Sequence, residues 1–246
     1  MPVRIANWNL DRAKQLWRRE SIRERMADVD AHVWVLTESR DCVTPGPGYR
    51  RIAHSTAHAR GDNDERWVSI WTIFPNAVLR RTRDEEYSAC AIVALSSDVA
   101  LAVYGTVLPW RGSVWRGHAS ANATAYQAAL SALAEDWREL RDMPEVRGIC
   151  VAGDFNQDLS DTPYYWSNTA RHLLQRTLDD CGLAATTSEP TDPVRAVTNG
   201  AKACIDHICL SQRAMTRQVG TSHAWAPTND GRTLSDHPGV WIELDF

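Results

Sequence analysis

Residues 151–156, Val-Ala-Gly-Asp-Phe-Asn, form the stretch on which the fold prediction depends. The apolar run ends in a glycine, which is followed by Asp154 and Asn156. Because alternate side chains of an extended chain point the same way, these two residues can face one pocket. A glycine before the aspartate lets another backbone or a ligand approach closely. The stretch therefore predicts a buried strand ending at a polar site, although a simple turn has the same composition.

Two Asp-His pairs lie further along the chain. Asp206 and His207 interrupt an apolar run, where burying a carboxylate is costly unless it is paired or binds a metal. Asp236 and His237 follow Ser235, just before the last predicted strand. A carboxylate bonded to an imidazole raises its basicity and fixes its tautomer. We expect Asp206 to orient His237 from across the sheet, with Asp236 near a metal or nucleophile; solvent-facing residues at strand ends are the alternative.

Polar residues also close the first two predicted strands. Asn9 ends the first strand, and Glu38 follows the second. A carboxylate at the end of an apolar strand is a reasonable ligand for Mg²⁺, which prefers oxygen donors. An exposed glutamate near the start of a helix is the alternative for Glu38.

Periodicity predicts a sheet-rich α/β protein with helices outside. Valine, isoleucine, tryptophan and tyrosine are typical of strands, and such runs occur at Val3–Asn9, Ala31–Thr37, Trp67–Phe74, Ala89–Leu95, Ala100–Val107, Gly148–Ala152, Ala203–Leu210 and Val240–Leu244. Apolar residues at steps of three and four predict helices over Leu16–Val29, Ala119–Arg141 and Thr169–Cys181. Gly182 is suited to end the last of these helices.

Length and composition set limits on the class of protein. The 246 residues suit one α/β domain, and we expect a single domain over residues 1–246. No apolar run approaches the roughly 20 residues that span a bilayer, and the N-terminus resembles a strand rather than a signal peptide. The six cysteines form no CxxC pair, so we interpret them as mostly buried apolar residues and expect a cytoplasmic protein.

The charge balance bears on the partners. There are 27 basic and 31 acidic residues, which gives a net charge of −4. A protein that binds nucleic acid by broad phosphate neutralisation is usually basic. The balance disfavours a dedicated DNA-binding module, but it is compatible with an enzyme that meets phosphate through a metal and a few arginines.

Taken in order, the motifs resemble a known family. A Trp-Asn pair ending the first strand, a glutamate after the second, GDxN, xDH and a terminal SDH resemble the endonuclease/exonuclease/phosphatase superfamily. It includes deoxyribonuclease I, exonuclease III-type AP endonucleases, sphingomyelinases and inositol polyphosphate 5-phosphatases. The resemblance runs from residue 4 to residue 240, and GDxN and SDH are its most specific parts. It implies a four-layer α-β-β-α sandwich with two packed mixed β-sheets.

The resemblance also implies roles for the motif residues. Glu38 corresponds to the principal metal ligand, Asn9 to an amide that helps to hold metal and phosphate, and Asp236 to a second carboxylate near the metal. Asp154 corresponds to the residue that positions or deprotonates the attacking water, and Asn156 to a phosphate contact. His237 corresponds to the histidine on the scissile phosphate, and Asp206 to the acid that orients it. The implied cofactor is Mg²⁺, with Mn²⁺ as a possible substitute. Asp11 is a weaker match to a further acid near the metal.

One position departs from the family pattern. Many members have a histidine or tyrosine in the central strand where this chain has Val107. Help for the leaving group must therefore come from elsewhere, or activity is reduced. Arg111, Arg116 and His118, just downstream, are candidates, although each could be a simple loop residue.

The eleven tryptophans add a substrate hypothesis. Trp8, Trp34 and Trp137 suit core positions. Trp110, Trp115, Trp166 and Trp225 fall in predicted loops and could stack on bases or sugars. We expect the loop from Trp110 to Ala121 to be a substrate-facing rim, with Trp110, Arg111, Arg116 and His118 as its binding residues.

Three functions remain open from the sequence. The first is a Mg²⁺-dependent nuclease with a nucleic acid substrate, which the Trp-Asn-x-Asp start and the compact size favour. The second is a phosphatase or phosphodiesterase acting on a small or lipid phosphate, which the acidic charge favours. The third is a non-catalytic binding domain, which only the valine at position 107 favours.

Overall fold

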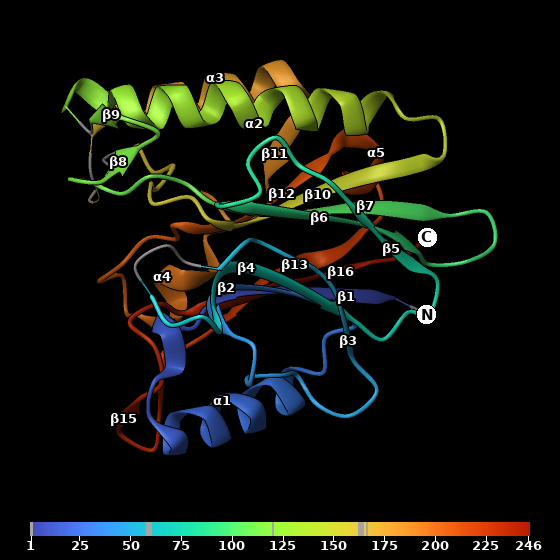
Figure 1. Ribbon diagram of the computed structural model, residues 1–246, viewed down its shortest axis with the longest axis vertical. Coiled ribbons are helices and arrows are strands. Elements are labelled where there is room, and N and C mark those ends of the chain that lie inside the picture. The colour runs from blue at the N-terminus through green and yellow to red at the C-terminus, as the bar shows by residue number, and fades with distance from the viewer. Residues whose placement is uncertain (1, 58–60, 120, 162–164, 166) are drawn as a thin grey trace.

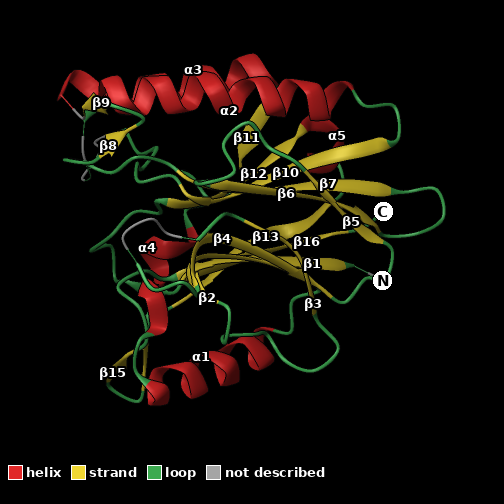
Figure 2. Cartoon of the chain, viewed as in Figure 1, coloured by secondary structure: helices red, strands yellow, loops and turns green. Residues whose placement is uncertain are grey.

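The computed structural model describes residues 2–57, 61–119, 121–161, 165 and 167–246. Two β-sheets pack face to face, and helices lie on both outer faces (Figures 1 and 2). In both views, α2 (Thr124–Asp142) and α3 (Asn168–Cys181) lie above the sheets, and α1 (Leu16–Val29) lies below them. The four-layer α-β-β-α prediction is therefore confirmed.

The first sheet has six strands in the order β13-β16-β1-β2-β4-β3. β1 and β2 are parallel, with Asn9 beside Thr37, whereas each other neighbouring pair of this sheet is antiparallel. The strands are β1 (Val3–Asn9), β2 (Val33–Arg40), β3 (Arg50–His54), β4 (Glu65–Thr72), β13 (Gln218–Trp225) and β16 (Gly239–Leu244).

The second sheet also has six strands, in the order β11-β12-β10-β7-β6-β5. Its central strands β7 and β10 are parallel, and β10 is antiparallel to β12, so that Asp154 lies beside Val107 on one side and opposite Asp206 on the other. The strands are β5 (Ala77–Arg80), β6 (Ser88–Ala94), β7 (Ala100–Val107), β10 (Val146–Asp154), β11 (Leu183–Ala185) and β12 (Asp206–Ser211).

Short elements connect these layers. Two ribbons pair β8 (Val114–Trp115) with β9 (His118–Ala119), and β14 (Thr228–Asn229) with β15 (Arg232–Thr233). The short helices are η1 (Asp11–Ala13), η2 (Ala121–Ala123), α4 (Pro193–Val197) and α5 (Gln212–Met215).

The predicted helices are present; the start of α2 differs by five residues from the prediction, and its end and the start of α3 differ by one residue each. α1 has the predicted bounds, and α3 ends at Cys181 because Gly182 adopts a left-handed conformation (φ 68°) and donates to the carbonyl of Leu178. α2 begins at Thr124 rather than at Ala119, because Ala119 belongs to β9. The apolar stripe that predicted α2 is buried; it consists of Tyr126, Leu130, Leu133, Trp137 and Leu140.

The strand predictions miss the edges of both sheets. β13 and β3 are the outer strands of the first sheet, and β11 and β5 are those of the second. An edge strand is half-exposed and often charged, so it lacks the apolar pattern of a central strand. β12 also begins at Asp206, three residues later than the predicted start at Ala203.

Three apolar clusters fill the layers. One lies between the sheets and includes Ile5, Val103 and Ile208, and the others lie under the helices on either side. The predicted core positions of Trp8, Trp34 and Trp137 are confirmed, since each is fully buried. Five cysteines are buried, and only Cys42 of the six is exposed, which bears out the interpretation of most of them as core residues.

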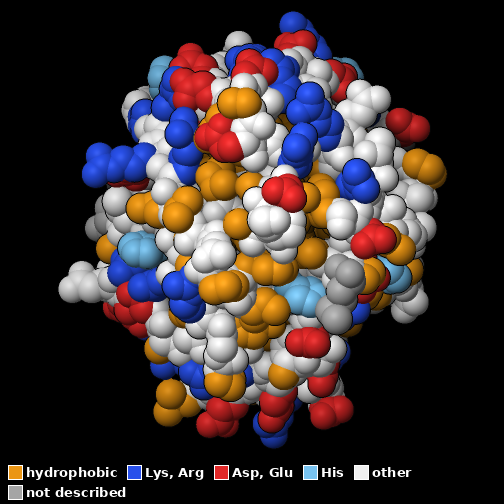
Figure 3. Space-filling view, turned by 90° about the vertical axis from the view of Figure 1, so that its right-hand side faces the viewer, with side chains coloured by type: hydrophobic (Ala, Val, Ile, Leu, Met, Phe, Trp, Pro, Cys, Tyr) orange, Lys and Arg blue, Asp and Glu red, His pale blue; other side chains and the backbone are white. Residues whose placement is uncertain are grey.

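The two chain ends lie on one side of the molecule, at the right of Figure 1. Figure 3 views this side and shows basic and acidic side chains interspersed around apolar ones. In the part of the chain that the structure describes, no helix is long and apolar enough to cross a membrane. The loops after β1, β2 and β10 lie on the opposite side (Figure 1), and these strands end at or near Asn9, Glu38 and Asp154.

Candidate active site

The GDxN stretch lies where two strands come unusually close. Gly153 has φ of 150°, and a Cβ atom there would lie 1.8 Å from the carbonyl oxygen of Thr106. Only glycine fits, as the sequence predicted from the close approach of another backbone. The next residue, Asp154, is 2% exposed, and its Oδ1 accepts a hydrogen bond of 2.9 Å from the backbone N–H of Asn156.

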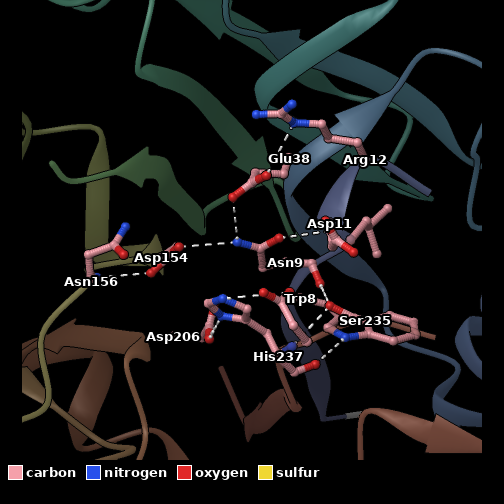
Figure 4. A network of polar contacts seen from close by, with 12 residues as sticks. Trp8, Asn9, Asp11, Arg12, Glu38, Asp154, Asn156, Asp206, Ser235 and His237 are labelled. Atoms are coloured by element: carbon pink, nitrogen blue, oxygen red, sulfur yellow. Dashed lines mark hydrogen bonds and ion pairs between the residues drawn. The ribbon is translucent and has the colours of Figure 1, made fainter. Parts of the chain in front are cut away.

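Asn9 joins the two sheets at this point. Its Nδ2 donates to Oδ2 of Asp154 at 3.1 Å and to Oε1 of Glu38 at 3.2 Å (Figure 4). Asn9 ends β1 and Glu38 lies near the end of the parallel neighbour β2, so the two strands carry these groups to the same place. The sequence prediction that Asn9, Glu38 and Asp154 share one site agrees with this geometry.

Asp206 and His237 form a short polar contact in the site. Oδ2 of Asp206 lies 2.7 Å from Nδ1 of His237, as expected for an acid that orients an imidazole (Figure 4). The Asp206 side chain is 3% exposed and that of His237 14%. Asp236 lies further out, with Oδ1 3.8 Å from Nε2 of His237 and a side chain that is 67% exposed.

The loop that carries His237 is tied to β1 by neutral hydrogen bonds. Ser235 Oγ donates to the carbonyl oxygen of Asn9 at 2.6 Å and accepts from the backbone N–H of His237 at 3.1 Å. The indole of Trp8 donates to the carbonyl oxygen of His237 at 3.0 Å. Ser235 of the SDH motif therefore has a structural role: it holds this loop against β1.

Arg18 of α1 braces both halves of the site. Its guanidinium donates to the carbonyl oxygen of Leu234 at 2.9 and 2.7 Å and to that of Leu10 at 3.2 Å. It also lies 3.1 Å from Oδ2 of Asp11. Arg18 is only 8% exposed. Sequence reasoning missed this role, because an arginine on a predicted amphipathic helix gives no signal of a buried position.

Burial and neighbouring charges shift the pKa values of the central groups. Burial raises the pKa of Asp154 to about 8, and the Asp206 carboxylate adds to this rise. Burial also raises the pKa of Glu38, while the hydrogen bond from Asn9 opposes the rise. Burial alone would lower the pKa of His237, but Asp206 and, to a smaller extent, Asp154 and Asp236 raise it to about 10. His237 is therefore an imidazolium at neutral pH.

Several of these groups could hold a metal ion. By distance, one cluster qualifies in the described part of the chain: ligand atoms of Asp154, Asp206 and His237 lie within 4.8 Å of one another. However, Nδ1 of His237 is committed to Asp206, and its raised pKa disfavours the neutral form that binds metals. The oxygen donors of Glu38 and Asp154, next to the Asn9 amide, better match a hard cation such as Mg²⁺.

The predicted rim has two parts. Trp110 is 38% exposed and its ring lies 5.6 Å from that of Trp67, while Arg111 lies close enough to Tyr165 to influence its pKa. In contrast, Arg116 and His118 pack on Trp115 and away from the hydrogen-bonded centre. The Arg116 guanidinium lies 4.9 Å from the Trp115 ring and 3.4 Å from Asp84, and His118 stacks on Trp115 at 6.3 Å.

Trp225 is buried, which excludes it as an exposed stacking residue. Trp166 lies outside the described residues.

Sequence reasoning also missed two residues beside His237. A cavity of about 230 Å³ opens there, and Tyr165 and Lys202 line it together with Asn156. The Tyr165 hydroxyl donates to Oδ1 of Asn156 at 3.4 Å, and its backbone N–H donates to Oδ2 of Asp158 at 3.0 Å. Val107, by comparison, is 2% exposed and belongs to the core between the sheets. No sequence motif marks Tyr165, because it lies in a loop that belongs to none of the motifs.

A model of the endonuclease/exonuclease/phosphatase family matches residues 6–237. The chain belongs to the endonuclease/exonuclease/phosphatase family. The matched range contains β1 through the SDH motif, so it includes Asn9, Glu38, Asp154, Asp206 and His237. Membership identifies the chain as a phosphoester hydrolase. By sequence alone, it matches no curated protein.

Solved structures support this family's fold. The AP endonuclease LMAP from Leishmania major superposes with a TM-score of 0.76 at 14% identity, covering 100% of this chain and 88% of that one. An AP endonuclease from Archaeoglobus fulgidus gives a TM-score of 0.70 at 14% identity, over 99% and 100% of the chains. The 3′ phosphatase NExo from Neisseria, bound to a product DNA hairpin, gives 0.67 at 18% identity, over 99% and 100%.

Proposed function

We propose that this family member is a divalent-metal-dependent phosphodiesterase that hydrolyses nucleic acid by in-line attack of water. One observation supports this above the others: the Asn9 amide links the carboxylates of Glu38 and Asp154 beside the Asp206–His237 pair. Hydrolysis at phosphorus needs a positioned water, neutralisation of the non-bridging oxygens and a proton acceptor. The site offers a group for each of these tasks.

Asp154 is the proposed proton acceptor. Its carboxylate is held by Asn9 and by the backbone N–H of Asn156, so it keeps a single orientation. As water attacks phosphorus, its proton moves to Asp154, the bond to the alcohol oxygen breaks, and the leaving oxygen takes up a proton from solvent. Once deprotonated, Asp154 is a stronger base than an exposed aspartate because of its raised pKa, and a cation bound at Glu38 would favour this charged form.

His237 and two amides are the proposed phosphate contacts. An imidazolium held by Asp206 is a preorganised cation for a non-bridging oxygen. Asn156 is fixed because its Nδ2 donates to the carbonyl oxygen of Leu108 at 3.0 Å while its Oδ1 accepts from Tyr165. These two contacts fix the orientation of the Asn156 amide, and its second N–H is the proposed donor to the phosphate. The amide of Asn9 is the other proposed phosphate contact.

Glu38 is the proposed principal metal ligand, with Asn9 and Asp236 near the ion. Mg²⁺, or Mn²⁺ in its place, would neutralise charge that develops on the phosphate oxygens. The exposed carboxylate of Asp236 is better suited to contact a metal through water than to bind it directly.

Tyr165 is proposed to supply the hydroxyl that Val107 lacks. The phenol reaches the same cavity as His237, from the loop after β10 rather than from the central strand. Burial raises the pKa of Tyr165, which keeps the hydroxyl protonated, and the hydroxyl would turn from Asn156 Oδ1 to the phosphate group when the substrate binds. Arg111 and Trp110 are the rim residues proposed to meet the substrate; Arg116 and His118 are less suited because both pack on Trp115.

Nucleic acid is the proposed substrate, which the DNA-related neighbours support at the level of fold. A small phosphorylated substrate is the second candidate. The net charge of −4 and the limited cavity of about 230 Å³ beside His237 favour it. This second candidate substrate is a phosphomonoester or a lipid phosphodiester.

A substrate panel tests the proposal. We would incubate the purified protein with plasmid DNA, DNA and RNA oligonucleotides, inositol phosphates and sphingomyelin vesicles, each with Mg²⁺, with Mn²⁺ and with chelator. Metal-dependent cleavage of nucleic acid, abolished by Asp154→Ala and retained by Asp180→Ala on the exposed face of α3, is the expected result. Cleavage of only the small phosphates would select the second candidate. Absence of hydrolysis throughout would favour a binding domain.

A further inference from the structure

The turn after Asn9 has an uncommon backbone. Asp11, Arg12 and Ala13 have φ of 42°, 59° and 39°, so three successive residues other than glycine are left-handed. Such a conformation is unfavourable for residues with a Cβ atom and persists only where the surroundings impose it.

Several contacts impose this turn. The backbone N–H of Asp11 donates to Oδ1 of Asn9 at 2.9 Å, and that of Ala13 donates to the carbonyl oxygen of Leu10 at 3.0 Å. Ala13 is fully buried, and Arg18 holds Leu10 and Asp11. The turn is therefore a fixed support for the side chain of Arg12.

The turn directs Arg12 to the proposed metal ligand. Nε of Arg12 lies 3.5 Å from Oε2 of Glu38 (Figure 4). It also lies 3.9 Å from Oε2 of Glu65. Glu65 is buried and already paired with Arg40 at 2.8 Å. The other oxygen of Glu38 accepts from Asn9. The Glu38 carboxylate is thus shared between an amide on one oxygen and a guanidinium on the other.

We propose that Arg12 is a fixed cation of the metal site, which weakens divalent-metal binding until a phosphate is present. The inference rests on the proposed role of Glu38 as metal ligand. A divalent ion on Glu38 lies next to the guanidinium, and two cations that share one carboxylate repel each other. A phosphate anion between them offsets the repulsion, so metal and phosphate each strengthen the binding of the other. The site would then hold its metal most tightly when the substrate is bound.

Calorimetric titration with Mg²⁺, alone and in the presence of inorganic phosphate, tests this proposal. We would compare the wild type with Arg12→Asn, since asparagine tolerates a left-handed backbone, and with Arg12→Lys, which keeps the charge. Without phosphate, Arg12→Asn should bind Mg²⁺ about three- to fivefold more tightly, the range of a partly exposed ion pair. Phosphate should strengthen Mg²⁺ binding to the wild type and to Arg12→Lys more than to Arg12→Asn.

Two controls make each outcome decisive. Arg176→Gln removes an equal charge from the exposed face of α3; equal tightening in this variant would show a long-range charge effect and overturn the proposal. Unchanged or weaker Mg²⁺ binding in Arg12→Asn would also overturn it, and Arg12→Gly replaces Arg12→Asn if melting curves show a folding defect. If Glu38→Gln binds Mg²⁺ as well as the wild type does, the metal assignment of the proposed function fails, and this inference fails with it.

Discussion

The two sides of the site are built differently. On the His237 side, the imidazole lies 2.7 Å from Asp206, and both side chains are nearly buried. On the Glu38 side, the carboxylate lies 3.5 Å from Arg12; 23% of the Glu38 side chain and 36% of the Arg12 side chain are exposed. In the proposed function, the first pair is a preorganised cation for phosphate, whereas the second is open enough for ions to enter and leave. In this proposal, catalytic electrostatics and metal exchange are thus separated across Asn9.

Among the substitutions that test the difference between the two sides, replacing His237 should have the largest effect on kcat. His237→Ala removes the imidazolium and should lower kcat by about 10²–10³, the usual loss for one electrostatic contributor to the transition state. Mg²⁺ affinity should change little, because the Glu38 side is intact. Steady-state kinetics and calorimetry measure the two quantities, with His223→Ala, an exposed histidine stacked on Trp241, as the matched control. An equal loss in His223→Ala would contradict the assignment.

Asp206→Asn should change the pH dependence as well as the rate. Asp206 is the main group that raises the pKa of His237 to about 10, against burial, which lowers it. Activity that needs the imidazolium is present below this pKa and is lost as pH rises through it. Without the carboxylate the pKa of His237 falls, so the alkaline limb of the pH–rate profile should move to lower pH. A limb at the wild-type position in Asp206→Asn would show that another group titrates there.

Glu38→Gln should mainly affect the metal. The amide keeps the shape of the side chain but loses the charge that Mg²⁺ prefers, so the Kd should rise about tenfold or more. Excess Mg²⁺ should then restore much of kcat, whereas it should restore none of the loss in His237→Ala. Activity assays over a Mg²⁺ concentration series distinguish these outcomes. A rate loss in Glu38→Gln that no metal concentration reverses would place Glu38 in the chemistry itself.

Arg18→Met should weaken both sides by a smaller amount. The guanidinium contacts the carbonyl oxygens of Leu10 and Leu234, and hydrogen bonds to charged groups contribute about 1.5–3 kcal/mol each. The free energy of unfolding should fall by about 2–3 kcal/mol, with kcat reduced a few-fold because both loops loosen. Urea unfolding and kinetics measure these effects. Arg176→Met, on the exposed face of α3, is the control, and an equal loss of stability there would count against the bracing role.

The central strands and the motif residues could be predicted because their signals are local. Apolar runs defined β1, β2, β7 and β10, and the polar residues at their ends follow from strand periodicity. The edge strands β3, β5, β11 and β13 could not be found in this way, since half of each faces solvent. The binding residues of the rim were predicted from residue type alone. In the structure, two of them, Arg116 and His118, pack on Trp115.

The sequence by itself identified the candidate groups: the order of Asn9, Glu38, Asp154, Asp206 and His237 indicated the family and the proposed chemistry. Only the tertiary structure decided how they are held. The hydrogen bonds of Asn9 cross between sheets, Arg18 reaches two loops more than 200 residues apart in sequence, and Tyr165 occupies the cavity that Val107 does not reach. Arg12 meets Glu38 because three left-handed residues turn it there. Such contacts depend on the packing of distant segments, for which a local pattern of residues contains no signal.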